Sequence, residues 1–239
     1  MHIDLGTKKA LILLDLQNEF LSPDGNFPIP HTSELLENIS QLVGHFREHC
    51  REAPIVWVRA EYPPVHEDPS SAPRSPFNVL TGRHTGRKPC CYAGTSGAEF
   101  SPQVKALISE TDVVITKTWY SAFKETNLDN LLKEQRVTKL FVAGLLSNVC
   151  VTSTATEATN MGYRVHIVES CLGWKRVESH RRALQSFPDL GIQTVAGVED
   201  IIHVEGVNLP TGPTVPSLYY VNGSIPSWRV LMALYEKAS

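Results

Sequence analysis

The sequence alternates short apolar runs with longer stretches of helical periodicity, and this alternation constrains the fold more than any other feature. The apolar runs lie at Ala10–Leu14, Ile55–Val58, Val113–Ile115, Leu140–Ala143 and Val165–Val168, with a further one near Ile192–Val195. Such short, continuous apolar runs are typical of strands that are covered on both faces. The helical stretches between them indicate crossover connections, so we expect a parallel sheet between two layers of helices.

The clearest helical pattern begins at a cap residue, Thr32 or Ser33, and its apolar residues form one stripe. The stripe consists of Leu35, Leu36, Ile39, Leu42, Val43 and Phe46. Further helices are predicted around Val104–Ile108, Leu128–Gln135, Cys150–Met161 and Val177–Phe187.

Three side chains with reactive groups stand where predicted strands end. Asp15 directly follows the first apolar run, Lys117 closes the third, and Cys150 comes just after the turn that follows the fourth. Ligands of open parallel sheets bind beyond the carboxyl ends of the strands. A helix N-terminus and a nearby ammonium stabilise a thiolate. A carboxylate beside them can accept the thiol proton and later pass it to a leaving amine.

Each of these residues also has an ordinary structural explanation. An Asp after a strand commonly forms a turn, and a Cys at the start of a helix commonly fills the core. A Lys at a strand end is commonly a solvated charge. The residue types alone therefore leave both interpretations open.

The stretch from Glu61 to Phe100 interrupts the alternation and has no clear periodicity. A loop of that length is either functional or disordered. We interpret it as a lid or pocket wall, with a mobile insertion or a subunit contact as the alternatives. Four arginines in or beside this loop could meet a substrate carboxylate: Arg59, Arg74, Arg83 and Arg87. Each of them is more commonly a solvated charge.

Charge and composition exclude several classes of function. Lys and Arg number 22 against 25 Asp and Glu, and this balance gives no electrostatic case for nucleic acid or an anionic membrane. No apolar run approaches the roughly 20 residues of a membrane span, and no secretory signal is recognisable. We therefore expect a cytoplasmic protein that acts on a small molecule. We also expect a homo-oligomer, although charge and composition do not establish this. The odd number of cysteines, five, argues against a disulfide framework.

Four segments resemble the signatures of the isochorismatase-like cysteine hydrolase family. They read LLDLQNEF (13–20), AGTSGAE (93–99), KTWYSAF (117–123) and VAGLLSNVCV (142–151). The resemblance runs from about Lys8 to Val204. It implies a three-layer α/β/α sandwich around a six-stranded, mainly parallel sheet, and an enzyme that needs no cofactor.

The resemblance also implies roles for single residues. Cys150 matches the family's nucleophile, Asp15 its general acid and base, and Lys117 the third member of the triad. The family's non-proline cis peptide would fall at Leu145–Leu146 and would turn the N–H groups of Leu146 and Cys150 toward an oxyanion hole. The residues expected to line the substrate pocket are Gln17, Phe20, Tyr120, Phe123 and Ser147.

Departures from particular subfamilies narrow the expected substrate. Nicotinamidases share an Asp-x-His metal motif after the second strand, which this chain lacks, so a metal site and nicotinamide are both disfavoured. Enzymes that hydrolyse isochorismate often have Gly at the position of Cys150, so a Cys there favours nucleophilic cleavage of a C–N bond. Ser147-Asn148 resembles the corresponding pair of ureide and carbamoyl-amide hydrolases.

The chain is thus divided into a hydrolase domain (1–205), a Pro-rich linker (206–216) and a tail (217–239). The tail resembles the first strand, turn and helix of a glutathione-transferase-like domain. One strand and one helix cannot fold alone. We expect the tail to be part of a longer fusion, or an element that packs on the hydrolase or on a neighbouring subunit.

The leading hypothesis is a cysteine hydrolase that cleaves a C–N bond of a small amide, ureide or carbamoyl compound. The first alternative is an isochorismatase that hydrolyses the vinyl ether of isochorismate to dihydroxy-dihydrobenzoate and pyruvate. The others are a non-catalytic scaffold and a redox-sensing thiol at Cys150.

Overall fold

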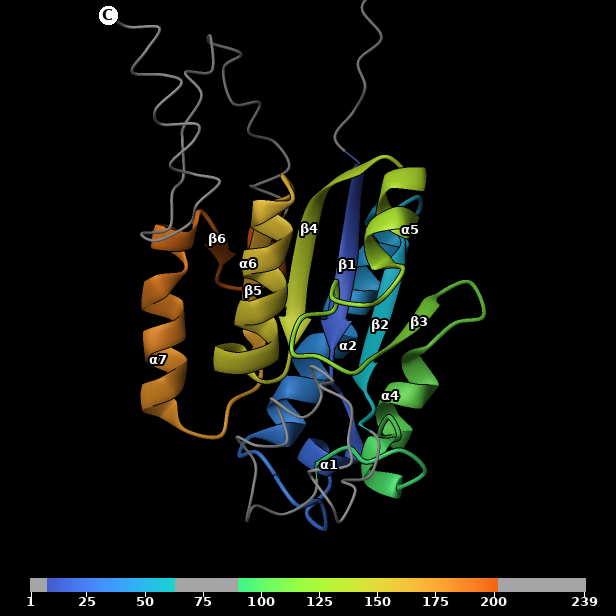
Figure 1. Ribbon diagram of the computed structural model, residues 1–239, viewed down its shortest axis with the longest axis vertical. Coiled ribbons are helices and arrows are strands. Elements are labelled where there is room, and N and C mark those ends of the chain that lie inside the picture. Colours follow the sequence, from blue (N-terminus) through green and yellow to red (C-terminus); the bar gives the residue numbers. More distant parts are fainter. Residues whose placement is uncertain (1–7, 63–89, 202–239) are drawn as a thin grey trace, which may run out of the picture. The chain divides into compact units, whose positions relative to one another are not determined.

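The apolar runs of the sequence form the strands of one sheet in the computed structural model, which describes residues 8–62 and 90–201 (Figure 1). The strands are β1 (Lys8–Leu14), β2 (Ile55–Ala60), β3 (Val113–Lys117), β4 (Val137–Gly144), β5 (Arg164–Leu172) and β6 (Gln193–Val195). All pairings between them are parallel, in the order β3-β2-β1-β4-β5-β6. The six-stranded α/β fold predicted from the sequence is confirmed.

Strand β1 is central because β2 and β4 flank it on either side. Leu11 pairs with Ile55 of β2 and with Phe141 of β4, and the whole run Ala10–Leu14 is inaccessible to solvent. Burial on both faces explains why this strand contains no alternating polar residues. Most strands extend beyond their apolar runs into polar residues, and β3 ends on Lys117 at its carboxyl end.

Helices cover both faces of the sheet (Figure 1). They are α1 (Asn18–Leu21), α2 (Thr32–His49), α4 (Pro102–Leu107), α5 (Leu128–Glu134), α6 (Thr152–Asn160) and α7 (Val177–Ser186). Single turns of 3-10 helix occur at Ser96–Ala98 and Pro188–Leu190, and one π-helical turn, Ser147–Val151, leads into α6.

Helix α2 begins differently from the expectation. Its N-cap is His31, which has a left-handed backbone (φ +51°) and provides no capping side chain, so neither Thr32 nor Ser33 is the cap. The apolar stripe is buried as predicted, apart from the half-buried Leu36. The backbone, and not a side chain, therefore sets where this helix starts.

Two apolar layers hold the helices to the sheet. On one face α2 packs on the sheet, with the rings of Phe46 and Phe141 meeting edge to face at 5.4 Å between centroids. On the opposite face Leu132 of α5, Ala155 of α6 and Ala183 of α7 belong to one buried cluster with the sheet. The three-layer arrangement follows from these two cores.

The strand order reverses direction between β1 and β4. The chain adds β2 and β3 on one side of β1, then returns to add β4, β5 and β6 on the other. Connections leave the two central strands in opposite directions at such a point, which opens a crevice at their carboxyl ends. The fold therefore places the most favourable position for a site just after Leu14 and Gly144.

Some expectations fall outside the described residues: most of the lid predicted within 61–100, the Pro-rich linker and the tail. No helix within residues 8–62 and 90–201 is both long and apolar enough to cross a membrane.

Candidate active site

Asp15, Lys117 and Cys150 meet at the carboxyl edge of the sheet. Lys117 Nζ lies 3.0 Å from Asp15 Oδ2 and donates a hydrogen bond to Cys150 Sγ at 3.2 Å. It also donates to the carbonyl of Trp119 at 3.1 Å. All three residues are buried: Asp15 is 1% exposed, Lys117 is 1% exposed and Cys150 is 8% exposed. The three strand ends singled out in the sequence therefore converge on one ammonium group.

Local backbone geometry presents Asp15 to this cluster. The residue follows the last residue of β1 and adopts the left-handed region (φ +55°), which is uncommon for a residue with a side chain. Its N–H donates to the carbonyl of Val58 at 2.8 Å, and its own carbonyl accepts from the N–H of Gln17 at 2.7 Å. These bonds hold an otherwise unfavourable conformation, as is frequent at functional sites.

The turn that carries Cys150 is fixed to the end of β1. Gly144 has φ +111°, and a Cβ on it would collide with the backbone carbonyl of Leu14. The N–H of Leu145 donates to the same carbonyl at 2.9 Å, and the Leu145–Leu146 peptide is cis. Only glycine fits this close approach of two backbones.

A π-helical turn then places the thiol. The N–H of Val151 donates to the carbonyl of Leu146 at 3.2 Å, the five-residue spacing of a π-helix. Such turns occur mostly as local insertions in α-helices, frequently at functional sites. Cys150 thus lies in the first turn of the helical segment that continues as α6.

Electrostatics in this buried cluster favour an ion pair beside a neutral thiol. Burial lowers the pKa of the Lys117 ammonium, but the negative charge of Asp15, and that of Cys150 when it is ionised, raise it more, so its pKa lies above the usual value. Burial raises the pKa of the Cys150 thiol, and the charge of Asp15 raises it further, against the opposing effect of Lys117. The expected stabilisation of a resting thiolate is therefore outweighed, and the thiol must lose its proton during the reaction.

One carboxylate oxygen beside the thiol is available for that proton. Asp15 Oδ2 faces Lys117, whereas Oδ1 is buried with no hydrogen-bond partner among the described residues. A buried carboxylate oxygen without a donor is costly unless it serves a function. This group has the capacity to act as a base.

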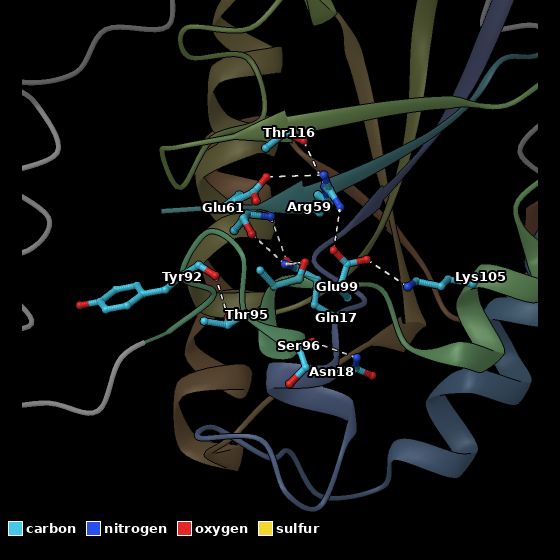
Figure 2. Close-up of polar contacts among 12 residues, drawn as sticks. Gln17, Asn18, Arg59, Glu61, Tyr92, Thr95, Ser96, Glu99, Lys105 and Thr116 are labelled. Carbon is cyan, nitrogen blue, oxygen red and sulfur yellow. Dashed lines mark hydrogen bonds and ion pairs between the residues drawn. The ribbon is translucent and has the colours of Figure 1, made fainter. Parts of the chain in front are cut away.

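Gln17 connects three segments around the site. Its side-chain amide donates to the carbonyls of Ala60 and Ala98, both at 2.7 Å, and its Oε1 accepts from the N–H of Ala60 at 2.8 Å (Figure 2). The side chain is inaccessible to solvent. These contacts indicate that Gln17 positions the end of β2, and its place in the substrate pocket stays a prediction.

The other expected pocket residues have different surroundings. Phe123 belongs to the core beneath α5 and α6, with its ring 5.8 Å from that of Tyr163. Ser147 is fully buried, and its hydroxyl lies 3.1 Å from Nδ1 of His180 on α7. Phe20 is 8% exposed, and Tyr120 is half-buried. Direct contact of these residues with a substrate stays a prediction.

A polar network beside β2 and β3 was not foreseen from the sequence (Figure 2). Arg59 lies 3.5 Å from Glu61 and 3.6 Å from Glu99, and it donates to the hydroxyl of Thr116 at 3.1 Å. Lys105 pairs with Glu99 at 3.0 Å. Arg59 therefore pairs with carboxylates of its own chain. The remaining arginines considered for a substrate carboxylate lie outside the described residues: Arg74, Arg83 and Arg87.

Glu19 is a second buried carboxylate near the site, and the sequence analysis did not single it out. It is 2% exposed and accepts hydrogen bonds from the N–H groups of Asn26 at 2.7 Å and Cys91 at 3.1 Å. A Cβ at Gly97 would collide with it. Its place four residues after Asp15, within the LLDLQNEF segment, was the available signal.

A cavity of about 640 Å³ lies against α1. Described residues that line it include Asn18, Glu19, Tyr92, Ser96 and Gln103, but not the three residues of the buried cluster. Among residues 8–62 and 90–201, no group of three or more His, Cys, Asp or Glu side chains is arranged to hold a metal ion.

Comparison with known proteins places the described fold in context. The chain matches the isochorismatase domain over residues 9–199. It is 27% identical over 192 residues to the uncharacterized isochorismatase family protein YwoC of Bacillus subtilis. That alignment covers 80% of this chain and 91% of YwoC. It is 29% identical over 185 residues to the ureidoacrylate amidohydrolase RutB of Methylobacterium radiotolerans. That alignment covers 73% of this chain and 70% of RutB.

The fold is also similar to solved structures. One is the nicotinamidase PncA from Bacillus subtilis, with a TM-score of 0.65 and 28% identity. The alignment covers 79% of this chain and 99% of that protein. Asp15, Lys117 and Cys150 all fall within the region that matches the domain.

Proposed function

The chain belongs to the isochorismatase family, and from that premise we propose that it is a cysteine hydrolase that cleaves a C–N bond of a small amide, ureide or carbamoyl compound. The observation that carries the proposal is the contact of Lys117 Nζ with both Asp15 and Cys150, at 3.0 and 3.2 Å. This arrangement contains a nucleophile, a base and a cation that orients both, which is the minimum for covalent hydrolysis.

In the first half of the proposed reaction, Cys150 Sγ attacks the substrate carbonyl carbon while its proton passes to Asp15. The new C–S bond displaces the carbonyl π electrons onto oxygen. When this oxyanion collapses, the C–N bond breaks and Asp15 returns the proton to the leaving amine or ammonia. A thioester on Cys150 remains.

In the second half, water attacks the thioester carbon and gives a proton to Asp15. The C–S bond then breaks, the acid product leaves, and Asp15 reprotonates the sulfur. Lys117 keeps its charge throughout, since its neighbours raise its pKa. Its role is to hold the carboxylate and to stabilise negative charge on sulfur as it develops.

We further propose that the N–H groups of Leu146 and Cys150 bind the oxyanion. Leu146 precedes the π-helical turn, and no backbone carbonyl among the described residues accepts its N–H. Two such donors beside a buried thiol would stabilise the charge that develops during attack.

The substrate class rests on the nucleophile and on the similar proteins. A vinyl ether needs only protonation, whereas a retained Cys150 with its own base is suited to attack on a carbonyl carbon. The names of the ureidoacrylate amidohydrolase and the nicotinamidase among the similar proteins point to C–N cleavage. Nicotinamide itself is disfavoured by the missing Asp-x-His motif after β2.

The test is a screen of ammonia release from small amides and ureides, run beside pyruvate release from isochorismate. Cys150→Ala and Asp15→Asn should each lower ammonia release by about 10³-fold or more. Cys50→Ala, which alters a buried thiol at the far end of α2, should keep nearly full activity. Ammonia release that persists in Cys150→Ala contradicts the proposal, and pyruvate release that persists there supports an isochorismatase.

A further inference from the structure

Two adjacent thiols, Cys90 and Cys91, lie outside the proposed triad. Their Sγ atoms are 3.9 Å apart, within the distance of a weak S–H···S contact. Cys90 is half-buried, whereas the other four cysteines, all within the described ranges, are buried. Cys90 is therefore the thiol that a small solute reaches first.

The backbone of Cys91 is fixed to two elements of the site. It has φ +50°, again in the left-handed region. Its N–H donates to Glu19 Oε2 at 3.1 Å, and its carbonyl accepts from the N–H of Tyr62 at 2.9 Å. The N–H of Ala93 donates to the carbonyl of Tyr62 at 2.8 Å. The dithiol is thus joined to the end of β2 and to helix α1.

Tyr62 is coupled electrostatically both to this pair and to the buried cluster. Burial raises the pKa of its hydroxyl, and negative charge on Cys150 and Asp15 raises it further, as do Cys90 and Cys91. The backbone of Tyr62 is bonded to that of Cys91, so a movement of Cys91 also moves a residue whose hydroxyl is electrostatically coupled to Asp15 and Cys150.

We propose that Cys90 and Cys91 are a redox-active dithiol that small hydroperoxides oxidise to a vicinal disulfide, and that this modification reversibly inhibits the enzyme. The inhibition rests on the proposed function, whereas the oxidation does not. Nothing in the triad mechanism uses either thiol.

The chemistry proceeds in two balanced steps. Cys90 Sγ attacks the terminal peroxide oxygen, the O–O bond breaks, and an alcohol leaves with a sulfenic acid formed on Cys90. Cys91 Sγ then attacks the sulfur of Cys90, the S–O bond breaks, and its thiol proton leaves with the hydroxide as water. Overall, two thiols and one hydroperoxide give a disulfide, an alcohol and water.

The order of attack follows from the environments of the two thiols. The contact with Cys90 raises the pKa of Cys91, and burial raises it further, so Cys91 remains a thiol until a sulfenic acid forms beside it. Cys90 is the more exposed. Exposure favours oxidation, and a neighbouring thiol favours resolution to the disulfide.

Closing the bond has a consequence for the site. The sulfurs must approach from 3.9 Å to about 2.05 Å, while the peptide bond keeps the two Cα atoms at a fixed separation. The change is taken up by the side-chain torsions and the backbone of residues 90 and 91. The bonds from Cys91 to Glu19 and Tyr62 are the contacts that this movement disturbs.

The experiment treats the full chain with tert-butyl hydroperoxide, then blocks remaining thiols and maps peptides by mass. We expect the peptide with Cys90 and Cys91 to lose two hydrogen atoms and to regain them with dithiothreitol. Cys90→Ser should not show this loss, and Cys171→Ser, which alters a buried thiol on β5, should show it fully. Cys91→Ser provides a second, independent loss of the disulfide.

Activity is measured on the same samples. Wild type should lose at least about ten-fold activity and recover it on reduction, whereas Cys90→Ser should start at normal activity and resist inactivation. If the mass spectra show sulfinic acid or mixed adducts at Cys90 and no disulfide, the dithiol assignment is overturned. Equal inactivation of wild type and Cys90→Ser would overturn the inhibition and point to oxidation of Cys150. The mass readout needs no substrate, so it stands even if no amide or ureide is hydrolysed.

Discussion

His166 on β5 is expected to set much of the acid sensitivity of the fold. Its side chain is 3% exposed and stacks on Phe141 at 5.1 Å between ring centroids. Its Nδ1 is buried with no hydrogen-bond partner among the described residues. Its pKa is lowered from 6.5 to about 4. Burial is the largest cause and the positive charges of Lys139 and Arg164 add to it, whereas hydrogen bonds to Gln193 and to the backbone of Arg164 favour the charged ring and oppose the shift.

The sign of the effect follows from linkage. The unfolded chain binds the proton near the ordinary pKa, whereas the folded chain resists it until about pH 4. The contribution of His166 to the free energy of unfolding is therefore fully present above its ordinary pKa. It is lost as the pH falls toward the lowered pKa of the folded state. At about 1.4 kcal/mol for each pKa unit, the loss from this group is on the order of 2 kcal/mol by about pH 5 and roughly 3 kcal/mol by about pH 4.

The assay compares urea unfolding of wild type and His166→Phe between about pH 7 and about pH 5. Phe keeps an aromatic ring against Phe141 but cannot titrate, so its free energy of unfolding should fall by about 2 kcal/mol less than that of wild type. A packing cost that does not depend on pH cancels, because the comparison is between the changes in unfolding free energy from about pH 7 to about pH 5. His49→Phe, at an exposed histidine, should follow wild type. Parallel curves for wild type and His166→Phe would refute the reasoning.

Three further predictions concern stability. Gly144→Ala should cost at least about 2 kcal/mol and lower the melting temperature, because its φ is +111° and the Cβ meets the backbone of Leu14. Gly44→Ala, in the interior of α2 where an added Cβ would meet nothing within 4 Å, should instead stabilise by roughly 0.5–1 kcal/mol. Asp112→Ala should cost about 2–3 kcal/mol in urea unfolding, because this buried carboxylate accepts hydrogen bonds from Arg47, from the Trp57 indole and from a backbone N–H. A cost below about 0.5 kcal/mol for Asp112→Ala would contradict that account.

The layout of the fold was predictable because it depends on local pattern. Apolar runs such as Ala10–Leu14 gave the strands, and parallel pairing then required helices on both faces. The convergence of Asp15, Lys117 and Cys150 followed from their places at strand ends. These inferences need only the rule that parallel strands share one carboxyl edge.

Side-chain contacts were less predictable because they depend on packing between distant segments. The contacts of Gln17 with Ala60 and Ala98, and the pairing of Arg59 with Glu99, require the precise placement of segments far apart in the chain. The raised pKa of the Cys150 thiol depends on burial, which residue types alone do not give. Helix α2 begins at a left-handed His31, a backbone feature with no side-chain signature.

The placement of the proposed triad has a consequence for how the protein would acquire activity. Lys117 comes from β3 and Cys150 follows β4, with β2 and β1 between those strands in the sheet. Pairing of β1, β2 and β3 brings Asp15 and Lys117 together, but the thiol arrives only when β4 docks on β1 from the other side. Recovery of hydrolysis during refolding is thus a stricter marker of the native state than helical content or collapse, because these contacts join residues of high sequence separation. A partly assembled sheet has the ion pair of Asp15 and Lys117 without the thiol of Cys150.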